Sequence, residues 1–170
     1  KLSLNPNIED GFLNINLSLS DYVNEIVRSY QEISNKEFVI SLEKYNNPIN
    51  TNKSIEIIYG LRNFIGNANK FSKKKIEIIL ISNKKITNIT IRDDGPGFPD
   101  DLIDKHRLGE PYIRTTDQKN ISKYGLGLGT FIGKTLLEKN YANINFNNSS
   151  ETGGAEVLIK WKNSDLIKIN

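Results

Sequence analysis

Two neighbouring segments in the middle of the chain alternate between apolar and polar residues, and only a short polar stretch separates them. The segments cover residues 75–81 and 86–92, and Ser82-Asn83-Lys84-Lys85 lies between them. Strict alternation is typical of strands with one buried face, and a polar connection of this length predicts an antiparallel hairpin. Because the apolar face of such a hairpin must be buried, other elements of the chain have to cover it.

Helical periodicity supplies the covering elements. A first helix is predicted from its expected N-cap, Ser20, to the break at Ser34-Asn35. A second is predicted from about Ile55 to near Phe71-Ser72, and a third from about Leu126 to Asn140. The remaining strands are predicted at 12–19, 38–42, 144–146 and 155–161. The expected fold class is α/β (α+β), a two-layer sandwich with one mixed, mostly antiparallel sheet and helices on one face.

Composition limits the function classes. The chain has 170 residues, 37% hydrophobic and 25% charged, with no Cys and a net charge of +3. It is expected to form one domain over 12–170 after a linker over 1–11, without disulfides. The small net charge and the lack of a long apolar run argue against nucleic-acid binding and direct membrane contact, so we expect a cytoplasmic domain. Since the chain does not begin with Met, we expect it to be part of a longer protein.

One candidate motif is Asp93-Asp94-Gly95-Pro96-Gly97-Phe98, where a predicted strand ends. Glycines allow a sharp turn close to a ligand, and a carboxylate there can accept a hydrogen bond from an exocyclic amine such as that of adenine. Asp-Gly-Pro-Gly is also an ordinary turn sequence, so the motif alone leaves both interpretations open.

A second motif, Gly125-Leu126-Gly127-Leu128-Gly129-Thr130, opens the third predicted helix. Backbone amides at a glycine-rich helix N-terminus bind phosphate groups. The spacing is neither the dinucleotide-binding fingerprint nor a Walker loop, which would end in Gly-Lys-Ser/Thr. A glycine-rich hinge without a ligand is the alternative.

A third motif lies on the second predicted helix, where Asn63, Asn67 and Lys70 share one face. Two amide oxygens one turn apart can help to bind Mg²⁺, and a Lys beside them can reach a phosphate. The alternative is an ordinary solvated face, although asparagines are poor helix formers and call for some explanation.

The order of these motifs resembles that in the catalytic ATP-binding domain of sensor histidine kinases, which belongs to the GHKL superfamily and has the Bergerat fold. Residues 63–72 resemble the N box, Asp94-Gly95-Pro96-Gly97 and Gly125 to Gly129 resemble the two glycine boxes, and 108–112 resemble the F box. Residues 153–157 resemble the closing glycine strand. The segments 109–112, 125–129 and 134–138 look closest to the redox-responsive RegB/PrrB group.

The resemblance implies a role for each motif. Asn67 and Asn63 would bind Mg²⁺, Lys70 would contact phosphate, Phe71 would line the nucleotide site, and Asp94 would accept a hydrogen bond from adenine. Residues 98–124 would form the ATP lid. The implied ATP-binding set is Asn67, Lys70, Phe71, Asp94, Gly95, Gly97, Arg114, Lys123, Gly125, Leu126, Gly127, Leu128, Gly129 and Thr130.

Three positions depart from the family pattern. Gly66 replaces a residue that is often acidic, and Ala155 replaces a Thr that supports the adenine-binding Asp in many relatives. Asn63 stands where gyrase-type, ATP-hydrolysing relatives carry a Glu that acts as general base. Because an amide cannot take a proton from water, Asn63 favours phosphoryl transfer over hydrolysis.

The expected function is that of the ATP-binding catalytic domain of a two-component sensor histidine kinase. It would present the γ-phosphate of Mg·ATP to a His on a separate dimerisation domain, from which the phosphate would pass to a response regulator. The only histidine, His106, lies in the predicted lid and is expected to be solvated, so the acceptor is expected elsewhere in a homodimeric parent. The alternatives are an anti-sigma-type serine kinase and a nucleotide-sensing module without transfer activity.

Overall fold

The computed structural model describes residues 17–43, 50–51, 54–104, 107–110 and 128–169. The elements in chain order are β1 (Leu17–Ser18), α1 (Leu19–Gln31), β2 (Glu37–Glu43), β3 (Asn50–Thr51), α2 (Ile55–Phe71), β4 (Lys75–Ser82), β5 (Ile86–Asp93), α3 (Asp100–Asp104), α5 (Leu128–Lys139), β6 (Asn143–Asn148), β7 (Ala155–Lys162) and α6 (Asn163–Leu166).

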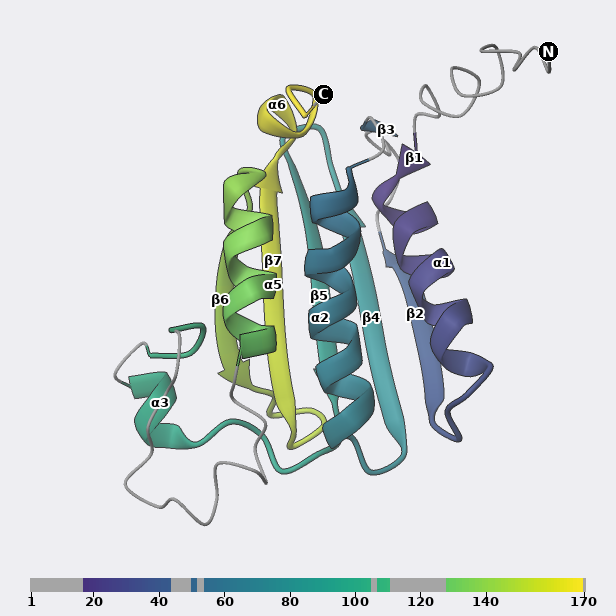
Figure 1. Cartoon of the computed structure of the whole chain (residues 1–170), viewed down its shortest axis with the longest axis vertical. Helices are drawn as coiled ribbons and strands as arrows, with labels where there is room; N and C mark the ends of the chain where they lie inside the picture. Colours follow the sequence, from purple (N-terminus) through teal and green to yellow (C-terminus); the bar gives the residue numbers. More distant parts are fainter. Residues whose placement is uncertain (1–16, 44–49, 52–53, 105–106, 111–127, 170) are drawn as a thin grey trace, which may run out of the picture.

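The main sheet has five strands in the order β2-β4-β5-β7-β6 (Figure 1). β2 pairs with β4 in parallel, and the other three pairings are antiparallel. The predicted hairpin is β4–β5, in which Ile78 lies opposite Ile91 and Leu80 opposite Ile89. The mixed, mostly antiparallel sheet predicted from the sequence is therefore confirmed.

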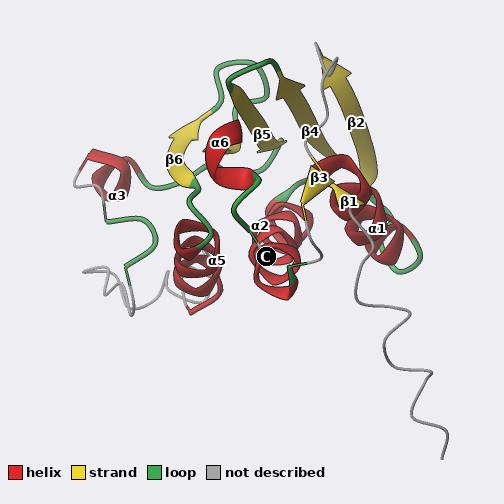
Figure 2. Ribbon diagram, turned by 90° about the horizontal axis from the view of Figure 1, so that it is seen from above, coloured by secondary structure: helices red, strands yellow, loops and turns green. Residues whose placement is uncertain are grey.

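The helices α1, α2 and α5 cover one face of this sheet (Figure 2). Alternate residues of β4 and β5 are buried against them, and the residues between are only partly covered. The core also includes the apolar faces of α1 and α2 and the inward side chains of β7, with Trp161 the largest fully buried side chain. Such burial of one sheet face is what stabilises a two-layer sandwich, so the predicted architecture is correct.

Two glycines bring α2 and α5 close together. A Cβ on Gly60 of α2 would lie 2.5 Å from the Cγ of Leu137, and one on Gly133 of α5 would lie 3.1 Å from the Cβ of Asn63. Because larger side chains would force the helices apart, these glycines allow the polar residues of the second half of α2 to meet the first turn of α5.

Some predicted boundaries need correction. Ser18, rather than Ser20, is the N-cap of α1: its Oγ accepts from the backbone N–H of Asp21, whose carboxylate accepts from the N–H of Ser18. This reciprocal pair is a capping box, and it starts the helix at Leu19, which the sequence placed in a strand. The predicted linker and most of the first predicted strand lie outside the described residues.

The segment predicted as an irregular lid contains a short helix. Residues 100–104 form α3, and Leu102 is buried with Leu108 in a small cluster against Phe98, Ile103 and Phe146. The short strands β1 and β3, which pair with each other, and the C-terminal helix α6 complete the structure. Within the described ranges, none of the helices combines the length and the apolar character that a membrane span needs.

Candidate functional site

A cavity opens beside the C-terminal half of α2, at the end of the sheet where β5 stops. Its lining is mostly apolar and includes four phenylalanines, two of them on α2, together with an amide, a hydroxyl and a carboxylate. The lining residues are Phe64, Asn67, Ala68, Phe71, Ile91, Asp93, Pro96, Gly97, Phe98, Pro99, Thr130, Phe146, Ala155 and Val157. An apolar cavity with a few polar groups is the usual form of a small-molecule site.

Asp93 supplies the carboxylate. It is the last residue of β5 and is 4% exposed. Its Oδ1 accepts from the backbone N–H groups of Gly95 (2.8 Å) and Ala155 (3.3 Å). Since these bonds within the described part of the chain both reach Oδ1, Oδ2 is left for a ligand. Burial raises the pKa of the Asp93 carboxyl above its usual range, and the two amides only partly offset that effect.

Asp94, the predicted adenine contact, faces the loop between α2 and β4 instead. Its Oδ1 accepts from the backbone N–H groups of Lys73 (2.7 Å), Lys74 (3.1 Å) and Lys75 (3.2 Å). Burial alone would raise the pKa of Asp94, but these amides outweigh it and lower the pKa. Its carboxylate anchors a loop and does not line the cavity, so this geometry does not support the predicted contact between Asp94 and the base, which stays a prediction.

The sequence contains a signal that distinguishes the two aspartates. Thr87, Ile89, Ile91 and Asp93 are the buried residues of β5, so Asp93 continues the inward-facing register. Asp94 follows the last strand residue and leaves that register. The period-two alternation that predicts β5 therefore selects Asp93 when it is continued by one residue beyond Arg92.

Asn63 and Asn67 do come together near the start of α5. Asn63 Nδ2 donates to the backbone oxygen of Tyr59 (2.8 Å), and Asn67 Nδ2 donates to the hydroxyl of Thr130 (3.2 Å). A Cβ on Gly129 would lie 3.3 Å from Asn63 Oδ1 and 4.0 Å from Asn67 Oδ1. Both amides are thus anchored through nitrogen with their oxygens facing one space, which fits the oxygen ligands that Mg²⁺ prefers.

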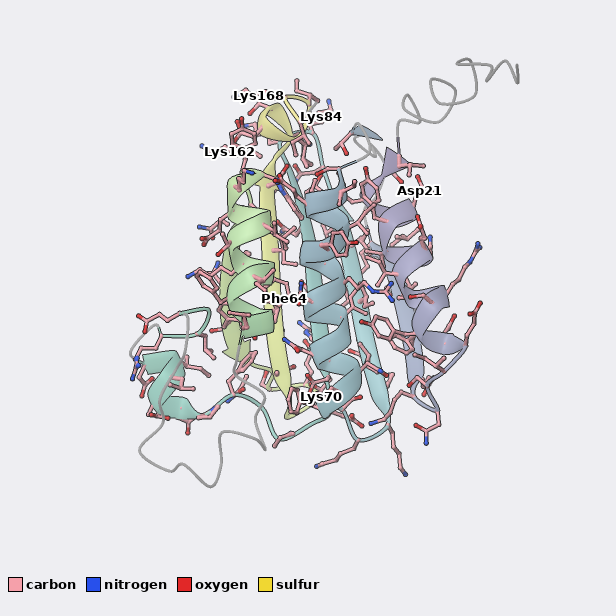
Figure 3. All side chains as sticks on the ribbon, viewed as in Figure 1. Asp21, Phe64, Lys70, Lys84, Lys162 and Lys168 are labelled. Carbon is pink, nitrogen blue, oxygen red and sulfur yellow. The ribbon has the colours of Figure 1, made fainter. Side chains whose placement is uncertain are left out.

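Of the two other predicted site residues on α2, Phe71 lines the cavity and Lys70 lies on the surface. The predicted place of Phe71 beside a nucleotide stays a prediction. Lys70 is exposed near the C-terminal end of α2, with its Nζ 5.2 Å from the centre of the Phe71 ring (Figure 3). It lies at the opposite end of the molecule from Lys84, Lys162 and Lys168. A phosphate contact by Lys70 is compatible with this position and stays a prediction.

The glycines after β5 permit close contacts around the cavity. A Cβ on Gly95 would lie 2.4 Å from the backbone oxygen of Phe71. Gly97 has a φ of +77° and leaves room for the side chain of Asn148. Leu128, Gly129 and Thr130 form the first turn of α5. The other predicted phosphate and lid residues, Arg114, Lys123, Gly125, Leu126 and Gly127, lie outside the described residues.

The structure also accounts for the two small residues that depart from the family pattern. The hydroxyl of Tyr30 would be 2.5 Å from a Cβ at Gly66, so α1 fills that space. Ala155 lines the cavity, and Thr152 donates from its Oγ1 to the backbone oxygen of Asp93 (2.6 Å). Thr152 was not predicted, because it precedes the closing glycines and shares no register with Asp93.

The sequence of the chain is similar to that of a known family. The chain matches the family described as histidine kinase-, DNA gyrase B-, and HSP90-like ATPase over residues 52–165. It is 37% identical to the sensor histidine kinase RegB of Cereibacter sphaeroides over 101 residues, which cover 56% of this chain and 21% of RegB. The chain therefore spans about a fifth of that relative's length.

Solved structures show the same fold. A mycobacterial sensor histidine kinase, MprB, superposes with a TM-score of 0.70 at 17% identity, covering 87% of this chain and 97% of that one. The catalytic domain of histidine kinase ThkA gives 0.69 at 18% identity, covering 88% and 97%. At this identity the likeness concerns the fold, which it confirms.

Proposed function

The chain belongs to the family of histidine kinase-, DNA gyrase B- and HSP90-like ATPases, and from that premise we propose that it binds Mg·ATP and presents the γ-phosphate to a histidine of a separate dimerisation domain. The observation that carries the proposal is the apolar cavity with one buried carboxylate, Asp93. Phosphate would then pass from the histidine to a response regulator, and the parent protein would be a homodimer.

Recognition of the base would rest on Asp93 rather than Asp94. The free Oδ2 of Asp93 can accept a hydrogen bond from the amino group of adenine, while Oδ1 stays bound to the amides of Gly95 and Ala155. Phe64, Phe98 and Phe146 contribute aromatic surface to the cavity. A buried acceptor left without a donor costs free energy, so a base lacking this amino group would bind less tightly.

The phosphate end of the site would lie at the junction of α2 and α5. Asn63 and Asn67 would hold Mg²⁺ through their amide oxygens, and Mg²⁺ would neutralise phosphate charge. Lys70, Arg114 and Lys123 would add positive charge, and the backbone amides of Gly125, Gly127 and Gly129 would bind phosphate oxygens. The anchored nitrogens of the two asparagines support this role, because they fix which atom of each amide faces the ligand.

A calorimetric titration tests nucleotide binding. The chain titrated with ATP in the presence of Mg²⁺ is expected to bind, and ATP without Mg²⁺ is expected to bind more weakly. If no heat of binding is detected at millimolar nucleotide in either titration, ATP binding is refuted, and both kinase hypotheses fail with it.

The identity of the acceptor needs the full-length protein. After incubation with radiolabelled ATP, a phosphohistidine would be labile to acid and stable to base. An acid-stable label on a separate substrate protein would support the anti-sigma-type serine kinase. ATP binding without a labelled protein in the presence of the candidate partners would support the nucleotide-sensing module. Because the proposed substrate is ATP, we place the domain on the cytoplasmic side of any membrane in which the parent lies.

A further inference from the structure

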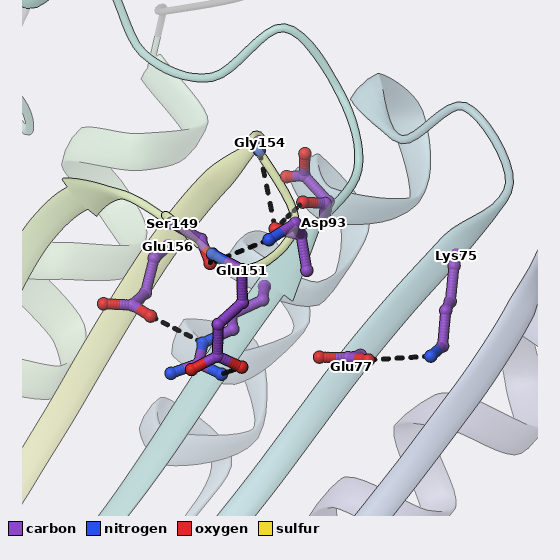
Figure 4. Close-up of polar contacts among 9 residues, drawn as sticks. Lys75, Glu77, Asp93, Ser149, Glu151, Gly154 and Glu156 are labelled. Carbon is purple, nitrogen blue, oxygen red and sulfur yellow. Dashed lines mark hydrogen bonds and ion pairs between the residues drawn. The ribbon is translucent and has the colours of Figure 1, made fainter.

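The turn between β6 and β7, residues 149–154, lies directly against Asp93 (Figure 4). We propose that Thr152 is a positioning residue that holds the Asp93 carboxylate in place for the base, and that the Arg92–Glu151 ion pair keeps the turn where Thr152 can do so. The inference rests on the proposed role of Asp93 in binding adenine, and it assigns a further residue to that site.

Three contacts connect the inner side of the turn to Asp93. The Thr152 hydroxyl donates to the backbone oxygen of Asp93 over 2.6 Å. The N–H of Ala155, just after the turn, donates to Oδ1 of the same residue. Gly154 leaves no room for a side chain, because a Cβ there would lie 2.2 Å from the Asp93 backbone oxygen. The main chain and the side chain of Asp93 are therefore both held by one short segment.

The turn is itself well connected. The N–H of Ser149 donates to the oxygen of Gly154, and the N–H of Gly153 donates to the oxygen of Ser149. The Ser149 hydroxyl, in a buried residue, accepts from the N–H groups of Glu151 (3.2 Å) and Thr152 (3.3 Å). Because Ser149 binds both residues, the position of Thr152 depends on that of Glu151.

Arg92 holds the turn from the other face of the sheet. It precedes Asp93 on β5, so its side chain points away from the cavity. Its Nε contacts Glu156 of β7 at 2.6 Å, and its NH1 contacts Glu151 of the turn at 2.7 Å. The Arg92 side chain is 18% exposed and that of Glu151 67% exposed, so the second pair is partly screened by water. The Thr152 hydroxyl should therefore contribute more to the position of Asp93 than the Arg92–Glu151 ion pair does.

The hydrogen bond from Thr152 adds a side-chain donor to Asp93 that Ala155 cannot supply. The methyl group of Ala155 lines the cavity but offers no hydroxyl to Asp93, and it leaves the carboxylate with two backbone donors. Thr152 instead fixes the main chain of Asp93 from behind the cavity. A shift of that main chain would move Oδ2 relative to the bound base, so the effect should appear in base selectivity rather than in phosphate binding.

The test compares ATP with purine riboside triphosphate, which lacks only the 6-amino group. The wild-type chain should bind ATP roughly tenfold or more tightly than the analogue, the value expected for a hydrogen bond to a charged group. Thr152→Val should lower this ratio several-fold while the affinity for the analogue stays within about twofold. Thr152→Ser, which keeps a hydroxyl, should restore the ratio, and Arg92→Gln should lower it less than Thr152→Val does.

Thr90→Val is the matched control, since Thr90 lies on the outer face of β5 two residues before Arg92 and should leave the ratio unchanged. An unchanged ratio in Thr152→Val overturns the inference and leaves the proposed function standing. A wild-type chain that binds ATP no better than the analogue overturns the role of Asp93 itself. If Thr152→Val fails to fold, Arg92→Gln decides: a lowered ratio supports the inference, and a wild-type ratio overturns it.

Discussion

Exchanging each of the two neighbouring aspartates for asparagine should separate ATP affinity from stability. Asp93→Asn should lower the affinity for ATP, and Asp94→Asn should lower the melting temperature. In Asp93→Asn the new amide oxygen can still accept from Gly95 and Ala155, but the atom that faces the base becomes a donor. Losing a hydrogen bond to a charged acceptor costs about 1.5–3 kcal/mol, which is roughly a 10- to 150-fold loss of ATP affinity. Asp94→Asn should leave ATP affinity nearly unchanged, because that carboxylate binds the amides of residues 73–75.

Thermal stability should fall in Asp94→Asn and not in Asp93→Asn. The pKa of Asp93 is raised by burial, so the unfolded state ionises more readily than the folded state. The ionised carboxylate therefore lowers stability above its unfolded pKa of about 3.9, and Asp93→Asn should keep or raise the melting temperature at neutral pH. The pKa of Asp94 is lowered, so its charge stabilises the fold. For a chain of 170 residues, an Asp94→Asn loss of about 1 kcal/mol should lower the melting temperature by about 2–4 °C.

Calorimetric titration with Mg·ATP and a thermal scan of the same samples measure both effects. If Asp94→Asn weakens ATP binding and Asp93→Asn does not, the reasoning from strand register fails and the choice of Asp94 made from the sequence is right. If both variants bind ATP as the wild type does, neither carboxylate contacts the base.

Three further predictions concern the metal, the pH and the packing around Asp93. Gly129→Ala should keep or slightly raise the melting temperature, because Ala favours a helix, but its methyl group would enter the space that the oxygens of Asn63 and Asn67 face. The gain in ATP affinity on adding Mg²⁺ should therefore shrink, whereas an unchanged gain would exclude a metal at that point. ATP affinity should fall with decreasing pH as Asp93 takes up a proton, and because its pKa is raised this loss should begin above the range of an ordinary Asp. Asp93→Asn should remove that pH dependence, and its persistence in the variant would assign it to another group. Gly154→Ala should destabilise the fold by more than about 2 kcal/mol, seen as a lower denaturation midpoint, because its Cβ would lie 2.2 Å from the Asp93 backbone oxygen; a wild-type midpoint would show that the turn can move away.

Local patterns in the sequence predicted most of the fold. The alternation in 75–81 and 86–92 predicted the central hairpin, and the apolar spacing from Ile55 onward predicted α2 with an end near the observed one. The errors arose where a local signal had a close competitor. Ser18 and Ser20 are both good N-caps, and only Ser18 has an acidic residue three positions later that completes a capping box.

The site was harder to predict because its parts come from distant segments. Asn67 and Thr130 are 63 residues apart, and their hydrogen bond depends on the close approach of α2 and α5 at Gly60 and Gly133. Thr152 reaches Asp93 across the turn of another hairpin, 59 residues away. No periodicity in a single sequence encodes such contacts, whereas the choice between Asp93 and Asp94 was encoded in the alternation of β5.

The polar groups of the cavity also bear on the choice of phosphate acceptor. Among the described lining residues, Asp93 is the one carboxylate, and its oxygens serve the backbone amides and the proposed base. Asn63 and Asn67 have amide side chains that cannot accept a proton. Water or a serine hydroxyl must lose a proton when it attacks phosphorus, so either would need a base from elsewhere. A neutral imidazole already carries a free electron pair on one ring nitrogen and attacks without a base. The described part of the site therefore suits a histidine acceptor better than a serine or water.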